Sequence, residues 1–180
     1  MTSVSADFIA RSRYLLGEEY RTKLRKTLDA LPPDALWWRA NAESNSVGNL
    51  LLHLAGNARQ WIVSGVGEAE DKRFRAAEFT ADGGQAVAEL WEIVEAALRD
   101  ADAVLAALDE SKLARRLTIQ GREVTVLGAV YHVVEHFSMH MGQIILLAKL
   151  LSPGSIRFYE DAGGMARPLW KEGAEQFRRS

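Results

Sequence analysis

Apolar residues recur at near-multiples of one helical turn in four long stretches of this chain, and no other feature of the sequence constrains the fold as strongly. The clearest stretch places Leu90, Val94, Leu98 and Leu105 on one face and Glu95 on another. A helix with one apolar stripe gains most of its stability by packing that stripe against other helices. Four such helices joined by connectors of moderate length predict an all-α protein built as a four-helix bundle.

Proline, serine and glycine residues set the expected bounds of these helices. The first ends at Pro32-Pro33, because proline cannot continue a helix, and Ser46 is a natural N-cap for the second. The four helices are expected near residues 8–31, 46–65, 87–108 and 125–151. Between them, residues 66–84 are expected to form a polar loop. Residues 116–124, with the turn-like Gln120-Gly121, are expected to form a small β-hairpin.

A length of 180 residues favours a single domain, here taken as residues 1–180. Apolar residues make up 48% of the chain, which is enough to bury a core without disulfides. Within this domain, residues 152–180 are expected to be an irregular C-terminal tail that packs on the bundle. A short helix is expected inside the tail, near residues 172–179.

Composition excludes several classes of function. The net charge is −2 and the charges are well mixed, so no nucleic-acid partner is expected. The chain has no cysteine, which excludes thiolate zinc sites and thiol nucleophiles. The most apolar stretch, residues 124–151, contains Glu135 and three histidines, which favours a buried bundle helix over a membrane span. Residues 1–10 lack the apolar core of a signal peptide, so a cytoplasmic location is expected.

The four histidines of the chain all fall inside predicted helices. His132, His136 and His140 are spaced by four residues on the most apolar helix, and therefore lie within about 80° of one another on one face. Pairs at i and i+4 commonly hold one metal ion. His132 and His140 are about 12 Å apart along the axis, so one ion would use an adjacent pair and a third ligand from elsewhere. His53, in the second helix, is the remaining histidine, and spacing alone does not say which pair it joins.

Two other interpretations compete for these residues. A buried histidine in a bundle is commonly a hydrogen-bonded core residue with no ligand role. In addition, His132-Val133-Val134-Glu135-His136 fits the H-x-x-E-H pattern of inverzincin proteases. Those enzymes need a further acidic ligand far downstream, and too little chain follows His136 to supply it. Glu135 is instead expected to pair with an arginine.

Two segments together resemble a known family. They are Asn45-Ser46-Val47-Gly48-Asn49-Leu50-Leu51-Leu52-His53-Leu54-Ala55-Gly56-Asn57 and His132-Val133-Val134-Glu135-His136-Phe137-Ser138-Met139-His140-Met141-Gly142-Gln143-Ile144. The chain resembles the DinB/YfiT-like metalloenzyme superfamily over about its first 150 residues. The resemblance implies a four-helix bundle with metal ligands at His53, His136 and His140. It leaves His132 as a neighbour of the site. It also implies zinc or nickel as the metal and a homodimer.

The resemblance also suggests a chemistry. Members with known activity resemble thiol-dependent transferases and isomerases that use mycothiol, bacillithiol or glutathione. We therefore expect a metal-dependent transferase that adds a low-molecular-weight thiol to a small electrophilic substrate. A metal-dependent hydrolase and a non-enzymatic, metal-stabilised binding or stress-response module are the alternatives. Asn57 and Gln143 are expected either to orient a ligand or contact substrate, or to be ordinary solvated or helix-capping amides. Arg73 and Arg75 are expected to be surface charges.

Overall fold

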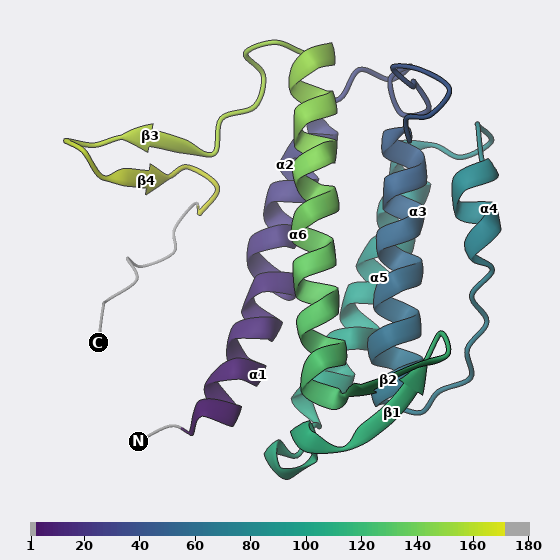
Figure 1. Ribbon diagram of the computed structural model, residues 1–180. Helices are drawn as coiled ribbons and strands as arrows, with labels where there is room; N and C mark the ends of the chain where they lie inside the picture. Colours follow the sequence, from purple (N-terminus) through teal and green to yellow (C-terminus); the bar gives the residue numbers. More distant parts are fainter. Residues whose placement is uncertain (1–2, 172–180) are drawn as a thin grey trace.

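Four main helical elements form the bundle in the computed structural model, which describes residues 3–171 (Figure 1). The first element is one continuous helix made of α1 (Val4–Tyr14), a π-helical segment η1 (Leu15–Tyr20) and α2 (Arg21–Asp29). The others are α3 (Val47–Ala58) with its π-helical continuation η2 (Arg59–Val66), α5 (Val87–Ala106) and α6 (Val126–Leu151). The predicted all-α bundle is confirmed.

Side-chain caps fix where the helices that carry the histidines begin. Ser46 accepts a hydrogen bond from the backbone N–H of Asn49, and the Asn49 side chain accepts one from the backbone N–H of Ser46. This reciprocal capping box satisfies two backbone donors at the start of α3. At the start of α6, the Thr125 hydroxyl accepts a hydrogen bond from the backbone N–H of Gly128. The start of α3 therefore lies at the cap residue expected from the sequence.

The segment expected to be a loop at residues 66–84 contains a short helix, α4 (Arg75–Thr80), which packs along α3 (Figure 1). Its six residues are too few to show a helical repeat in the sequence. Tertiary contacts hold it in place: the buried Asn49 amide donates to the backbone carbonyls of Glu78 and Ala81. The expectation of a loop is therefore wrong for this part of the segment.

Two small hairpins complete the described structure. β1 (Arg116–Ile119) pairs antiparallel with β2 (Arg122–Thr125) through Gln120 and Gly121, both at positive φ, as a tight two-residue hairpin requires. The predicted hairpin is thus confirmed, and a 3-10 helix, η3 (Glu110–Ala114), precedes it. β3 (Tyr159–Asp161) pairs with β4 (Ala166–Pro168) and projects from the side of the bundle (Figure 1). The tail is therefore more regular than expected, and the helix expected near residues 172–179 lies outside the described residues.

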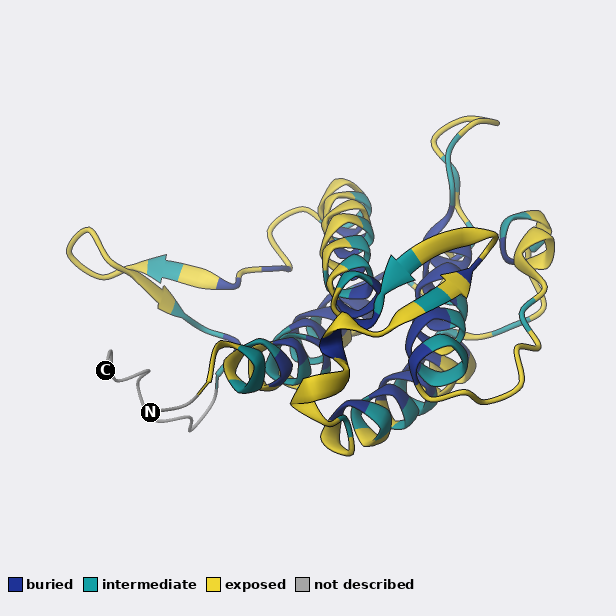
Figure 2. Ribbon diagram, turned by 60° about the horizontal axis from the view of Figure 1, so that its bottom comes forward, coloured by how far each residue is buried: buried dark blue, intermediate teal, exposed yellow. Residues whose placement is uncertain are grey.

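The core runs along the bundle axis between the four main helices. Figure 2 shows the buried residues on the inward faces of the helices and the exposed residues on the hairpins and outer faces. The largest fully buried side chains include Leu24, Leu51, Ile62, Leu90, Phe137 and Ile144. None of the helices formed by residues 3–171 has the combination of length and hydropathy needed to cross a bilayer.

Candidate metal centre

Three of the four histidines converge between α3 and α6. His53 comes from α3, and His136 and His140 come from successive turns of α6. Their ligand atoms all lie within 4.8 Å of one another, and this group could hold a metal ion. The Nε2 atoms of His53 and His136 are 3.0 Å apart. Two nitrogen ligands on one ion, each bonded at about 2.0–2.1 Å, have a similar separation.

His53 is the most enclosed of the three side chains. It is 5% exposed, and its ring packs on Phe79 of α4, with the ring centroids 4.7 Å apart. Its Nδ1 lies 2.8 Å from Glu78 Oε2. An ionised carboxylate only accepts hydrogen bonds, so this contact requires a hydrogen on His53 Nδ1, while Nε2 faces His136.

The Glu78 carboxylate is in turn held by Arg73. Arg73 Nε lies 2.7 Å from Glu78 Oε1, and the two side chains are only 4% and 9% exposed. Although burial alone raises the pKa of Glu78, hydrogen bonds from Arg73 and His53 bring its pKa below the ordinary value. Glu78 is therefore ionised near neutral pH, and its charge is balanced inside the protein.

His140 lies at the more open side of the group. Its Nδ1 is 2.7 Å from the Oε1 atom of Gln143. An amide oxygen only accepts hydrogen bonds, so this contact requires a hydrogen on His140 Nδ1. Burial lowers the pKa of His140, and the hydrogen bond with Gln143 opposes that change. The structure therefore places Gln143, which the sequence singled out, in contact with a candidate ligand.

His136 has the weakest hydrogen-bonding support of the three histidines. Its Nδ1 atom is buried and has no hydrogen-bond partner. Burial, followed by the neighbouring His140 and His53, lowers the pKa of His136 to about 3. The ring is therefore neutral near neutral pH, which is the form that binds metal.

His132, one turn before His136, is not part of the cluster. Its Nε2 lies 3.2 Å from Asn57 Nδ2, and its ring packs on Trp61, with the centroids 4.1 Å apart. The Asn57 amide, which the sequence singled out, is therefore within hydrogen-bond distance of His132. Burial also lowers the pKa of His132.

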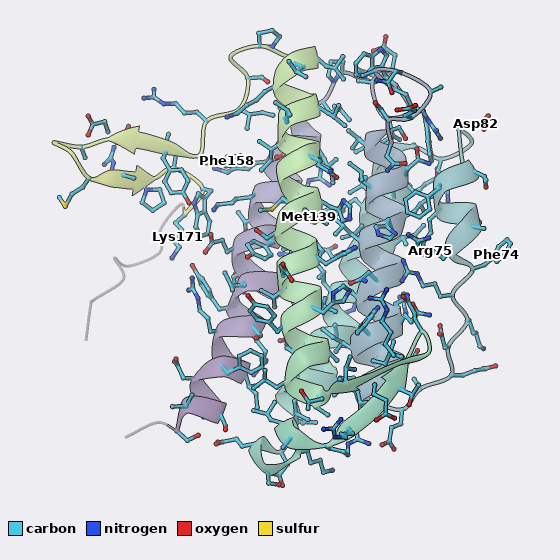
Figure 3. All side chains as sticks on the ribbon, in the orientation of Figure 1. Phe74, Arg75, Asp82, Met139, Phe158 and Lys171 are labelled. Atoms are coloured by element: carbon cyan, nitrogen blue, oxygen red, sulfur yellow. The ribbon has the colours of Figure 1, made fainter. Side chains whose placement is uncertain are left out.

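The sequence analysis missed the support behind His53. Arg73 was expected to be a surface charge, yet it is buried against Glu78, and Glu78 itself was not singled out. Arg75 is exposed, as expected, and its guanidinium carbon lies 4.8 Å from the centroid of the Phe79 ring. Figure 3 shows Phe74 and Arg75 at the start of α4 and Met139 on α6. Glu135, the central residue of the H-x-x-E-H pattern, is exposed. The sequence held no signal for Glu78, because a carboxylate in a polar stretch normally faces water.

The fold of this chain is shared with proteins of known structure. The structure is similar to the crystal structure of a DinB-like protein, YjoA, from Bacillus subtilis, with a TM-score of 0.61 and 18% identity over 81% of this chain and 96% of that one. It is also similar to a DinB-like protein from Bacillus cereus ATCC 10987, with a TM-score of 0.59 and 19% identity over 78% of this chain and 94% of that one. The chain therefore has the DinB-like fold.

The family of this chain is identified by a comparison of its sequence with family models. A family model described as a protein of unknown function, DUF1572, matches residues 3–159, and the chain belongs to this family. The match includes all four histidines as well as Arg73 and Glu78. The curated proteins contain no match to this sequence.

Proposed function

We propose that this protein is a divalent-metal-dependent transferase that adds a low-molecular-weight thiol to a small electrophile, with zinc or nickel held by His53, His136 and His140. The observation that carries the proposal is the convergence of three imidazoles within 4.8 Å. Three protein ligands leave a coordination position open, which is typical of catalytic rather than structural sites.

The donor set suits thiol chemistry. Three neutral imidazoles leave the full charge on a divalent ion, and a thiol bound to such an ion loses its proton to become the nucleophilic thiolate. The chain has no cysteine, so the thiol comes from a cofactor or substrate. The chain's own part is to hold the ion on three rings, of which His136 and His140 are half-buried.

The hydrolase alternative needs a base for water. Glu78 is the carboxylate in contact with the histidine cluster, but it already accepts hydrogen bonds from His53 and Arg73. It is therefore a support for His53 rather than a base free to activate water. This contact favours the transferase over the hydrolase.

The test is metal content and turnover of untagged protein. We expect about one equivalent of zinc or nickel in the parent protein. His136→Ala should contain little metal, because the two ligands that remain in the variant are too few to retain the ion. The metal-loaded parent should turn over mycothiol, bacillithiol or glutathione with an electrophile, and the variant should not. Tyr131→Ala, an exposed change on the same helix, is the control and should keep both properties.

The other outcomes identify the alternatives. Turnover of an ester without any thiol would replace the transferase with the hydrolase. Strong stabilisation by metal with no turnover of thiol or ester would favour the non-enzymatic module. Absence of bound metal in a folded parent protein would overturn the proposal altogether.

A further inference from the structure

The buried pair formed by Arg73 and Glu78 reaches the candidate metal centre from the side away from α6. Arg73 donates from Nε to Glu78 Oε1 at 2.7 Å and from Nη2 to Glu78 Oε2 at 2.8 Å. It also donates from Nη1 to Gln60 Oε1 at 2.9 Å. Three directed hydrogen bonds therefore fix this guanidinium, and the guanidinium fixes the carboxylate in a bidentate arrangement.

Two groups of opposite kind face the same nitrogen of His53. Glu78 Oε2, an acceptor, lies 2.8 Å from His53 Nδ1, and Arg73 Nη2, a donor, lies 3.1 Å from it. If Nδ1 carries the hydrogen, it donates to Glu78 and Nε2 keeps a free lone pair. If Nδ1 accepts from Arg73, the hydrogen moves to Nε2 and blocks the nitrogen that faces His136. The partner of Nδ1 therefore decides whether His53 can bind a metal ion.

We propose that Glu78, held by Arg73, is a positioning residue that fixes His53 in the tautomer with its hydrogen on Nδ1. The carboxylate is closer to Nδ1 than the guanidinium is, and it carries the charge that favours a donor. The same contact fixes the plane of the ring and strengthens the ligand, as carboxylates behind metal-binding histidines do. This inference rests on the proposed metal site. It adds a role for α4 and the residues just before it, which contain none of the histidines.

The first measurement does not require metal. In chelator-treated protein, ¹⁵N NMR of the imidazole nitrogens should show His53 protonated at Nδ1 and unprotonated at Nε2. A His53 signal with its hydrogen on Nε2 would overturn the inference. If the expected tautomer is found in a protein that binds no metal, the proposed function fails and the role of Glu78 in placing the hydrogen stands.

The second measurement is zinc(II) affinity by competition with a chelating indicator. Glu78→Gln keeps the shape of the side chain but loses its charge, and we expect its affinity to fall about 10- to 100-fold. Glu19→Gln is the matched control. Glu19 is a carboxylate that is 18% exposed and paired with the nearly buried Lys23, on α1–η1–α2 rather than at the cluster, so zinc affinity should be unchanged.

A double variant separates positioning from general stability. Arg73→Met with Glu78→Leu removes both charges, and replacing a buried pair with apolar residues commonly preserves stability. We expect this variant to fold, to lose the fixed Nδ1 hydrogen of His53 and to bind zinc at least 10-fold more weakly. Zinc affinity equal to that of the parent protein, in this variant or in Glu78→Gln, would show that Glu78 has no positioning role.

Discussion

The two sides of the histidine cluster are built differently. On the α3 side, His53 is buried and contacts an ionised carboxylate that is held by a buried arginine. On the α6 side, His140 contacts the exposed amide of Gln143, and the Nδ1 atom of His136 has no partner. The α3 side is held by a buried ion pair before any ligand binds, while the α6 side is held by the packing of α6 and by one contact with an exposed amide.

This difference indicates that the two sides of the site have different structural roles. A rigid ligand backed by hydrogen bonds sets the position of the centre. Ligands with fewer partners can adjust when an ion or a substrate binds. The α6 side is also the more exposed, so we expect substrate to approach along it. The comparison predicts that equal chemical changes on the two sides have unequal effects.

The largest difference should come from removing the hydrogen-bond partner of each histidine. Glu78→Ala leaves the Arg73 charge buried and unpaired, which costs about 3–5 kcal/mol of unfolding free energy. Gln143→Ala removes an exposed amide and should cost no more than about 0.5 kcal/mol. Urea unfolding of both variants in the presence of a chelator measures the two costs. Similar losses of unfolding free energy in the two variants would contradict the proposal that the α3 side is rigid and the α6 side adaptable.

Acid should act mainly through the α6 side. The pKa of His136 is lowered from 6.5 to about 3 in the folded protein. Below about pH 6.5 the unfolded chain takes up a proton that the folded chain does not, so stability falls with decreasing pH. Between about pH 7 and about pH 5 we expect a loss on the order of a few kcal/mol or less in the presence of a chelator.

The pH dependence can be assigned to His136 with a single variant. His136→Asn should show a smaller loss of stability over this interval, because it removes the group that the unfolded chain protonates. Denaturation curves at the two pH values, for the parent protein and the variant, test this expectation. An equal loss of stability in both proteins would show that groups other than His136 cause the pH dependence.

Two helical glycines should show the same difference with smaller effects than that of Glu78→Ala. A Cβ atom at Gly56 of α3 would overlap Glu78 Oε1 and lie 2.9 Å from Arg73 Nε, whereas a Cβ atom at Gly142 of α6 meets nothing within 4 Å. Gly56→Ala should therefore cost about 1–3 kcal/mol. Gly142→Ala should stabilise the protein by about 0.5–1 kcal/mol, because alanine favours a helix. The melting temperatures of the two variants should shift in opposite directions. A higher melting temperature for Gly56→Ala would indicate that the Arg73–Glu78 pair can move to accommodate a methyl group.

The bundle and the clustered histidines could be anticipated because both leave periodic patterns. Apolar spacing identified the four helices, and the spacing of four residues placed His136 and His140 on one face of α6. Spacing alone left the pairing with His53 open, and the family resemblance selected His136 and His140. The structure brings the same three residues together.

The support behind His53 could not be anticipated for a physical reason. Arg73 and Glu78 lie in a stretch rich in charged residues, where exposure is the ordinary state of each side chain. Their burial depends on α4 packing against α3, and α4 is too short to leave a periodic signal. The β3–β4 hairpin was missed for a similar reason, since its strands have three residues each.

The contact between His53 and Glu78 also bears on how the chain folds. These residues are 25 positions apart, whereas His53 and His136 are 83 apart. Closing the longer loop costs roughly 1 kcal/mol more in chain entropy. A mutation near α4 should therefore affect a contact with a small entropic cost of loop closure. A mutation in α6 should affect a contact whose loop-closure cost is larger. The hydrogen bond behind His53 therefore closes a shorter loop than the contact that joins His53 to His136.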